Sequence, residues 1–370
     1  MKILLVANYA KEHINKFHLP FIQKCNELGW TVDVACKADA EVPGAHHLFN
    51  LPMERNPYRI QTFSAIRQLK EIIQKEQYDV VHCHTYAGKF IGILAASTYR
   101  KNGLKVFYTS HGFQYYKGAH WYDWLVFLPI DKWLISKTDL LITINSEDTD
   151  VAKKYHFQVP KIEKCPCGIK LDKFQQASTK DRKQVLDEFG ILECSTVLIY
   201  VAELNSNKNQ AMLLRMYEKA SKTIDQLYML LVGPDHSDGK IPKLAEKYNG
   251  HVICTGWRSD VPDLIRASDY AVPSSKREGL GINVLEYMYC RVPVIATDNR
   301  GHRESVQNGV TGMLVQSNDD TAMARELIKL YRDPEQKKKM VEEAYRRVCQ
   351  LSDRTAVEHL IDIYKETLNL

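Results

Sequence analysis

The sequence lacks the features that mark several special classes of protein. Its 370 residues contain no uninterrupted apolar run of about 18 residues, the length that a helix needs to span a bilayer. The nine cysteines are scattered and odd in number, so they predict no disulfide framework and fit a reducing, cytoplasmic setting. Low-complexity segments are absent as well. These absences argue against a helical membrane protein, a domain stabilised by disulfide bonds and a disordered chain.

The sequence also lacks a large excess of charge of either sign. Lysine and arginine number 50 and aspartate and glutamate 45, which leaves a net charge of +5 with histidine neutral. So small a surplus permits attraction to nucleotides or to an anionic membrane surface but predicts no binding of nucleic acid. Hydrophobic residues make up 45% of the chain, as in an ordinary α/β protein, and the length suffices for two domains.

Segments with the apolar patterns of strands and helices alternate along the whole chain. The first series predicts strands at 2–8, 30–36, 80–84, 105–110 and 140–145, with helices at 15–28, 58–75, 89–100 and from about 146. The second series predicts strands at 196–202, 227–233, 252–255, 269–272, 292–297 and 312–315. Such alternation is typical of an α/β fold with doubly wound parallel sheets that carry helices on both faces.

The two series are separated by a segment with proline, glycine and few apolar residues, 165–176, which we interpret as the connection between two domains. The first domain is therefore predicted at 1–170 and the second at 171–352. The remainder, 353–370, belongs to a charged helical run at the end of the chain.

The strongest functional signal is a turn between the strand at 269–272 and the helix that follows it. Gly279 and Gly281 lie in this turn, so the N-terminus of the helix can offer N–H groups and a positive dipole to an anion such as phosphate. Glu278 precedes the helix and Glu286 lies inside it. Carboxylates accept hydrogen bonds from hydroxyl groups, and sugars are rich in hydroxyls.

This pattern resembles the E-x7-E motif of retaining GT-B glycosyltransferases, family four in particular. The residues that carry it are Glu278, Gly279, Leu280, Gly281 and Glu286. Two glutamates eight positions apart are common, but the glycines, the preceding strand end and the following Arg-Val-Pro-Val-Ile-Ala-Thr segment make the resemblance specific. It covers essentially the full chain. The resemblance implies the GT-B fold, in which two Rossmann-like domains face each other across a cleft and a C-terminal helix crosses back to the first domain.

The resemblance also assigns roles to individual residues. Glu278 and His111 would hold the donor sugar and Glu286 the ribose. Lys208, which follows a strand end at the start of a helix, would stabilise the leaving diphosphate together with the glycine turn. Further residues would border the nucleotide, namely Gly233, Trp257 and Arg258.

One position departs from the family. Glu203 stands where the family commonly has an arginine, and Ala202 stands where it has the preceding glycine. One of two usual phosphate cations is therefore missing. Arg277, beside the glycine turn, is the candidate to replace it.

Two other motifs invite a metal-binding interpretation. His82 and His84 end a strand with the same side-chain direction, which is compatible with a shared metal ion. The sequence shows no third ligand of matching character, and GT-B enzymes generally need no metal, so we expect none and assign one histidine a structural or acceptor-facing role. Asp148 and Asp150 form a DxD pattern at a helix start, where we assign them a capping role.

The function implied by the resemblance is transfer of a sugar, with retention, from a nucleotide diphosphate donor, expected to be a UDP-sugar. The acceptor would be a saccharide, including lipid-linked ones, in bacterial exopolysaccharide or capsule biosynthesis, and no cofactor is expected. Two alternatives remain open. A nucleotide-sugar 2-epimerase shares the architecture but needs an acid/base cluster beside the sugar. A catalytically weak scaffold in a polysaccharide assembly complex has only Glu203 in its favour.

A final expectation concerns the aromatic segment 113–133, which contains three of the five tryptophans. Trp and Tyr suit a boundary that is apolar on one side and wet on the other. The hypothesis is a peripheral contact with the cytoplasmic face of the inner membrane. The alternative is a core helix that buries Leu125, Val126, Leu128 and Ile130.

Overall fold

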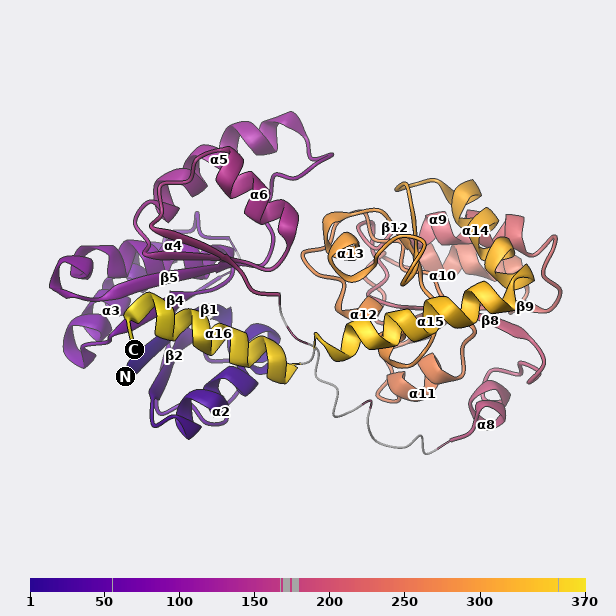
Figure 1. Cartoon of the computed structure of the whole chain (residues 1–370), viewed down its shortest axis with the longest axis horizontal. Coiled ribbons are helices and arrows are strands. Elements are labelled where there is room, and N and C mark those ends of the chain that lie inside the picture. Colours follow the sequence, from indigo (N-terminus) through magenta and orange to yellow (C-terminus); the bar gives the residue numbers. More distant parts are fainter. Residues whose placement is uncertain (55, 167, 169–173, 175–179, 352) are drawn as a thin grey trace. The chain divides into compact units, whose positions relative to one another are not determined.

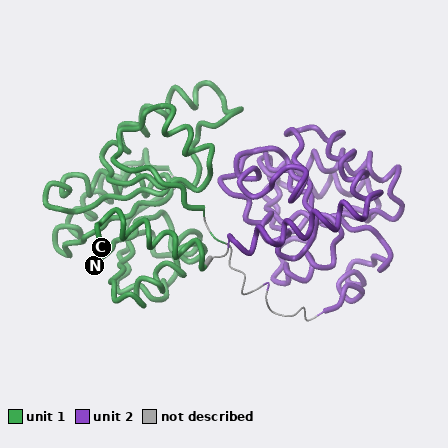
Figure 2. Tube along the Cα trace, viewed as in Figure 1, with its two compact units in different colours: residues 1–168, 353–370 green, residues 169–352 purple. Residues whose placement is uncertain are grey.

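The computed structural model describes residues 1–54, 56–166, 168, 174, 180–351 and 353–370. The chain forms two compact units (Figure 2). Unit 1 comprises 1–168 with 353–370, and unit 2 comprises 169–352. The connection predicted at 165–176 lies largely outside the described residues.

Unit 1 is built on a seven-stranded sheet in the order β3-β2-β1-β4-β5-β6-β7, with every neighbouring pair parallel. Its strands are β1 (Lys2–Tyr9), β2 (Thr31–Lys37), β3 (Leu48–Asn50), β4 (Val80–Cys83), β5 (Lys105–Ser110), β6 (Leu140–Thr143) and β7 (Lys161–Lys164). Five of these strands were predicted. The two at the edges, β3 and β7, were not, because they are short and none of their residues is fully buried.

Helices cover both faces of this sheet (Figure 1). They are the π-helix η1 (Ala10–Ile14), α1 (Asn15–Phe17), α2 (Leu19–Glu27), α3 (Gln61–Glu76), α4 (Tyr86–Ala96), the 3-10 helix η2 (Ser97–Asn102), α5 (Trp121–Ile135), α6 (Ser146–Lys154) and α16 (Asp353–Leu368). One face of the sheet packs against α3, α4, α5 and α6, and the other against α2 and α16. Residues of β1 alternate between the two cores, as the pleat of a strand requires.

The helix at the end of the chain, α16, belongs to unit 1, as the family resemblance implies. Its Tyr364 is fully buried, and the ring lies 5.0 Å from that of Phe107 and 5.3 Å from that of Phe21. The hydroxyl is 2.6 Å from Nδ1 of His82. A buried aromatic with a satisfied hydroxyl therefore anchors α16 on the sheet.

Unit 2 repeats the plan of unit 1. A four-stranded parallel sheet, β10-β9-β8-β11, is extended by a bridge between Ala271 and Val294 toward the parallel pair β12-β13. The strands are β8 (Thr196–Val201), β9 (Leu227–Val232), β10 (Val252–Gly256), β11 (Tyr270–Ala271), β12 (Ile295–Thr297) and β13 (Met313–Val315). The helices are α8 (Arg182–Asp187), α9 (Gln210–Ala220), α10 (Lys240–Ala245), the 3-10 helix η3 (Glu246–Tyr248), α11 (Val261–Arg266), α12 (Ile282–Tyr289), α13 (Arg300–Ser305), α14 (Asp320–Arg332) and α15 (Pro334–Cys349).

Both units have the strand order of a Rossmann-like sheet. The order reverses between β1 and β4 in unit 1 and between β8 and β11 in unit 2. Ligands of such sheets bind outside the carboxyl ends of the strands, at this point of reversal. The loops after β1, β4, β8 and β11 are therefore where function is expected.

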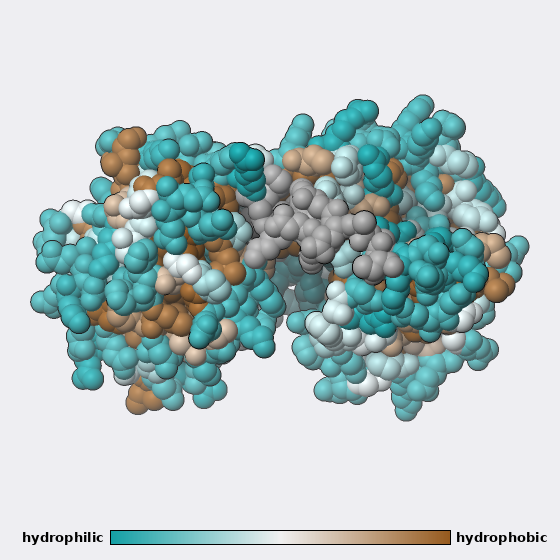
Figure 3. Space-filling model, turned by 90° about the horizontal axis from the view of Figure 1, so that it is seen from below, coloured by the Kyte–Doolittle hydropathy of each residue, from teal (hydrophilic) through white to brown (hydrophobic). Residues whose placement is uncertain are grey.

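The surface is mainly hydrophilic on the face seen in Figure 3, with apolar residues in scattered patches. None of the helices in the described part of the chain combines the length and the hydrophobicity needed to cross a bilayer.

A buried ion pair fixes α5 to α4. The ammonium of Lys89 contacts the carboxylate of Asp131, and both side chains are almost completely buried. Tyr115 donates to the second oxygen of Asp131 at 3.1 Å, and the Lys89 ammonium lies 4.5 Å from the ring centre of Tyr86. A buried charge left without its partner is costly, so this pair decides which face of α5 turns inward.

We predict that Asp131→Ala lowers the free energy of unfolding of unit 1 by about 3 kcal/mol, because Lys89 would keep a buried, unpaired charge. Denaturant unfolding followed by tryptophan fluorescence measures this, since four of the five tryptophans, at positions 30, 121, 124 and 133, lie in unit 1. Asp123→Ala, in the same helix but not buried, is the control and should change little. The double variant Lys89→Met/Asp131→Leu should recover much of the loss. An Asp131→Ala transition that coincides with wild type would contradict the assignment.

Candidate active site

The residues predicted from the sequence of unit 2 gather at one edge of its sheet. Lys208 follows β8, Gly233 follows β9, Trp257 and Arg258 follow β10, and Glu278 follows β11. Because these strands are parallel, their carboxyl ends and the loops after them share that edge.

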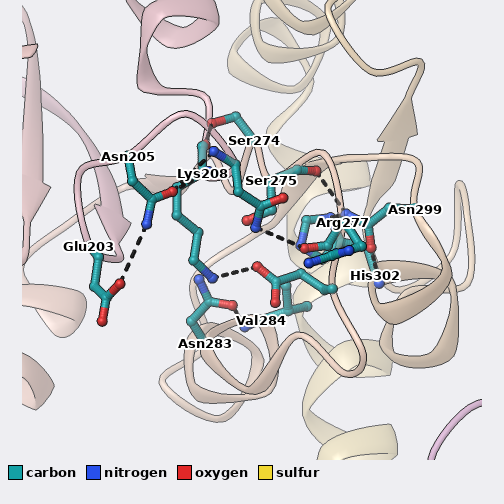
Figure 4. A network of polar contacts seen from close by, with 12 residues as sticks. Glu203, Asn205, Lys208, Ser274, Ser275, Arg277, Asn283, Val284, Asn299 and His302 are labelled. Atoms are coloured by element: carbon teal, nitrogen blue, oxygen red, sulfur yellow. Dashed lines mark hydrogen bonds and ion pairs between the residues drawn. The ribbon is translucent and has the colours of Figure 1, made fainter. Parts of the chain in front are cut away.

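An ion pair joins the two loops at the point of strand-order reversal. Lys208 Nζ lies 2.5 Å from Glu278 Oε1, and the side chains are 23% and 16% exposed. Figure 4 shows the Lys208 side chain extended across the gap between the loops. An ammonium has three donors, so Lys208 can keep Glu278 while it donates to an anionic ligand. The pair is accessible enough for a ligand and buried enough for its charges to act strongly.

Hydrogen bonds to backbone carbonyl groups hold the two loops together around this pair. Lys276 N donates to Asn207 O at 2.8 Å, and Asn207 Nδ2 donates to Arg277 O at 3.1 Å. Ser274 Oγ donates to Lys208 O at 2.7 Å. The position of Lys208 is therefore set by its backbone as well as by its side chain.

A second element, α13, supports Glu278 from behind. Arg300 is buried, and its Nε donates to Glu278 O at 3.2 Å. Gly301 packs so closely that a Cβ there would lie 2.6 Å from Glu278 Cβ. His302 is fully buried under the glycine turn, where a Cβ on Gly281 would lie 2.9 Å from its Cδ2. Burial lowers the pKa of His302 and keeps this ring neutral.

The sequence did not predict a role for these three residues of α13. A local signal existed, because Asn299 follows β12 and caps the helix by accepting from His302 N at 3.0 Å. That signal predicts a helix start at a strand end. It does not predict that this start packs on the glycine turn.

The helix after the glycine turn is fixed to the end of β8. Tyr287 OH accepts from Val201 N at 2.7 Å, and Asn283 Nδ2 donates to Val201 O at 3.1 Å. Gly281 is the residue before the first helical position, and Glu286 lies half-buried within α12. The predicted strand–turn–helix arrangement is thus present.

Glu203, at the position of the common arginine, lies at the exposed rim of this edge. Its carboxylate accepts from Asn205 Nδ2 at 3.4 Å and lies 3.4 Å from Nδ1 of His236. The neighbouring Ala202 explains why position 233 is a glycine. Any Cβ there would clash with the Ala202 carbonyl oxygen. Arg277, the candidate replacement cation, is exposed beside the glycine turn.

The two predicted residues in the loop after β10 have different environments. Trp257 is 73% exposed, as a side chain available for a ligand would be. The guanidinium of Arg258 instead bonds Asp260 at 2.8 Å and Glu188 at 2.8 Å, and these carboxylates raise its pKa. The charge of Arg258 is therefore engaged by the protein.

In unit 1, His111 follows β5 and joins a group of histidines. Its Nε2 lies 3.4 Å from Nδ1 of His84, and His13 and His18 lie beside them. His82 is separate, because its two nitrogens contact Tyr364 and Thr109. Burial lowers the pKa of His111 to about 4 and that of His82 to about 3.

Three expectations from the sequence of unit 1 concern His82, His84 and the DxD pattern of Asp148 and Asp150. His82 has a structural role, as expected for one member of the pair. The view that His84 has no further ligand-type neighbours is wrong, because the loop after β1 brings His13 and His18 to it. The capping role assigned to Asp148 and Asp150 is wrong, because the N-cap of α6 is Asn145, whose side chain accepts from Asp148 N at 2.8 Å. Asp148 is buried in the first turn, where it accepts from Phe113 N at 3.2 Å, and Asp150 is exposed.

Comparison with known proteins identifies the family of this chain. Residues 21–173 match the family Glycosyltransferase Family 4, and residues 181–347 match Glycosyl transferases group 1. The chain is 38% identical over 372 residues to EpsD of Bacillus subtilis (strain 168), which carries the name of a glycosyltransferase, with 100% of this chain and 97% of that protein covered. The chain therefore belongs to the GT-B glycosyltransferases and is an enzyme of that class.

Two further relatives are informative. An Escherichia coli UDP-Gal:alpha-D-GlcNAc-diphosphoundecaprenol alpha-1,3-galactosyltransferase is 28% identical over 292 residues, which cover 75% of this chain and 73% of that one. The crystal structure of Anabaena Alr3699/HepE in complex with UDP and glucose has a TM-score of 0.80 at 17% identity, with 99% and 100% coverage. At that identity the second likeness concerns the fold.

We predict that Lys208→Ala lowers kcat/KM for sugar transfer roughly 30-fold, about 2 kcal/mol, since a preorganised cation is lost where negative charge develops. Steady-state kinetics with the preferred nucleotide sugar measures the change. Lys276→Ala removes an exposed lysine from the neighbouring loop and serves as the matched control. A Lys208→Ala enzyme that stays within about threefold of wild type would place the diphosphate elsewhere.

Proposed function

We propose that this protein is a retaining glycosyltransferase that moves a sugar from a UDP-sugar to a saccharide acceptor in exopolysaccharide or capsule biosynthesis. The observation that carries the proposal is the Lys208–Glu278 pair beside the glycine turn, at the point of strand-order reversal in unit 2. A cation, a carboxylate and a helix start converge there, and these groups suit a diphosphate joined to a sugar.

The proposed reaction is a front-face displacement. The bond between the anomeric carbon and the diphosphate oxygen breaks, and the acceptor hydroxyl oxygen bonds to the same face of that carbon. The departing phosphate takes the hydroxyl proton, and Lys208 stabilises the negative charge that remains on it. Glu278 orients Lys208 through their ion pair and accepts from the sugar hydroxyls. The contact of His111 with the donor sugar stays a prediction from the family resemblance.

Two relatives support the choice of donor and acceptor. The Escherichia coli galactosyltransferase is named for a UDP-sugar and for a saccharide on a lipid diphosphate, and HepE was solved with UDP and glucose. We extend these features to this chain as a proposal: UDP for the nucleotide and a lipid-linked saccharide for the acceptor.

Assays with a panel of nucleotide sugars test the proposal and its alternatives. A transferase releases the nucleoside diphosphate, slowly by hydrolysis and faster with a saccharide acceptor. A 2-epimerase would convert UDP-N-acetylglucosamine to its epimer, and a scaffold would turn over none of the donors while it still folds. Release of UDP that rises with acceptor concentration is the expected result.

We predict that Glu286→Ala weakens the binding of free UDP at least about tenfold, because a hydrogen bond from the ribose to a charged acceptor contributes about 1.5–3 kcal/mol. Calorimetry with UDP measures the affinity. Glu335→Ala, an exposed glutamate on α15 of the same unit, is the control. An unchanged affinity for UDP in Glu286→Ala would remove the ribose role.

The site of action is proposed to be the cytoplasmic face of the membrane, on account of α5. The alternative of a core helix predicts that Leu125, Val126, Leu128 and Ile130 are buried. Leu128 and Ile130 do pack against the core, but Leu125 and Val126 are 65% and 48% exposed. Trp121 and Trp133 are 75% and 52% exposed. The buried residues of this helix are Asp131, Leu134 and Ile135. Its exposed large side chains are apolar as well, unlike the polar exposed face of an ordinary surface helix.

A second exposed apolar group adjoins this face. Ile60 and Phe63 are 81% and 76% exposed. The hydroxyl of Tyr58, which is close to this group in sequence, lies 2.8 Å from that of Tyr86. The ring of Tyr86 contacts Phe127 of α5. Exposed apolar patches of this kind mark interaction sites. The Lys137 ammonium lies 4.8 Å from the Trp133 ring centre, and cations beside aromatic rings suit an anionic lipid surface.

We predict that wild-type protein sediments with vesicles containing anionic lipid and that Trp121→Ala/Leu125→Asp reduces the bound fraction at least about tenfold, since each apolar side chain contributes about 1.5–3 kcal/mol when buried. Trp257→Ala changes an equally exposed tryptophan in unit 2 and should bind normally. Trp124 is unsuitable for this test, because its ring packs on Tyr115 and Tyr155. Equal binding by folded variants, or none by wild type, would refute the membrane role.

A further inference from the structure

Four histidines of unit 1 converge at the point where its strand order reverses. His84 follows β4, His111 follows β5, and His13 and His18 lie in the segment after β1. One ring nitrogen from each lies within 4.8 Å of those of the other three. Parallel strands β1, β4 and β5 are neighbours, so their carboxyl ends bring these residues to one spot.

An irregular helical turn brings His13 and His18 together in the segment after β1. In an α-helix, residues five apart point about 140° away from each other around the axis. The π-helix η1, with Asn15 N bonded to Ala10 O, and the break at His18 remove that divergence. As a result, Nε2 of His13 lies 3.1 Å from Nε2 of His18. π-helical turns are rare and occur frequently at functional sites.

The backbone beside His84 is held in a conformation of high energy. Thr85 has φ 62° and ψ 169°, a region that is essentially restricted to glycine. Its hydroxyl donates to Asn8 Oδ1 at 2.6 Å, which ties it to the end of β1. Such strain persists where the surroundings fix it, and it clusters at functional positions.

We propose that His13, His18, His84 and His111 form a binding site for one divalent transition-metal ion of the zinc type. With metal–nitrogen bonds of about 2.0–2.1 Å, a tetrahedral site separates its ligand atoms by about 3.3 Å. The distances of 3.1 Å between His13 and His18 and of 3.4 Å between His84 and His111 match two edges of such a tetrahedron. Small rotations of the side chains bring the two pairs together.

The convergence of the two pairs favours a metal over histidines that only bond one another. Hydrogen bonding requires contact only within each pair, but one ring nitrogen from each of the four residues lies within 4.8 Å of the other three. The ligand set also consists of imidazoles alone, which suit zinc, copper, nickel or iron, and not magnesium or calcium.

The proposed ion would fix the segment after β1 onto the ends of β4 and β5. Four protein ligands make a closed site, which is the arrangement of structural zinc. His13 and His111 are half-exposed, so an ion can reach the site from solvent. This proposal departs from the sequence expectation that no metal is needed, and it does not rest on the proposed function. An ion bound to Nε2 of His111 would leave only the other side of that ring for the predicted contact with the donor sugar.

The test uses the full chain with its purification tag removed, stripped of metal by a chelator and kept reduced. Titration with Zn²⁺ in a calorimeter should show one ion per chain. Replacement by Co²⁺ should give the intense visible absorption of a tetrahedral site, which needs no variant. Zn²⁺ should also raise the melting temperature, and a chelator should reverse this, because a ligand of the folded state stabilises it.

Variants then locate the ion. His18→Gln and His84→Gln should each weaken Zn²⁺ binding by more than about tenfold, since loss even of an outer-shell partner costs about 10–100-fold. His46→Gln, an exposed histidine of the same unit, is the matched control and should bind as wild type does. Circular dichroism checks folding. Absence of one-to-one binding, binding retained in both cluster variants, or stabilisation by inorganic phosphate without any effect of Zn²⁺ would overturn the proposal.

Discussion

The constraint on which this structure depends is that the strands of both units run parallel. Every connection must cross back over a face of the sheet, so the loops that leave the carboxyl ends gather at one edge. This places Lys208 beside Glu278, which is 70 positions later in the chain, and His84 beside His111. The reversal of strand order then opens the space between neighbouring loops in which such side chains meet.

The charges at the edge of unit 2 explain how a site with Glu203 in place of an arginine keeps a cation. Glu203 is turned to the exposed rim, where its charge is screened by solvent. Lys208 is three-quarters covered and bonded to Glu278, so its ammonium is held in place before a ligand arrives. Arg300, buried on the carbonyl of Glu278, adds a second cation that the sequence did not reveal. A preorganised cation acts more strongly than a mobile one, because no side-chain order has to be acquired on binding.

How much the sequence predicts depends on how local each feature is. The strands of both sheet interiors were predicted, because residues buried on two faces leave long apolar runs, whereas the edge strands β3 and β7 leave none. The glycine turn was predicted since strand, turn and helix are contiguous. The contact of Gly301 with Glu278 and the approach of His13 to His84 depend on tertiary packing and, for His13, on a π-helical turn without a sequence signature. Helix α5 has apolar residues around most of its circumference, so its sequence pattern did not predict which face is buried. The buried Lys89–Asp131 pair lies on the inward face, together with Leu134 and Ile135.

The two units use the same edge of the same topology for different chemistry. In unit 2 the side chains are oppositely charged and partly exposed, an arrangement that suits a charged ligand, since solvent and ligand can exchange there. In unit 1 the converging groups are imidazoles, of which His18 and His84 are buried. Two close contacts, His13 with His18 and His84 with His111, already pair these nitrogens two by two. The proposed cation would join the two pairs by accepting one lone pair from each ring, whereas added protons would place like charges a few ångströms apart.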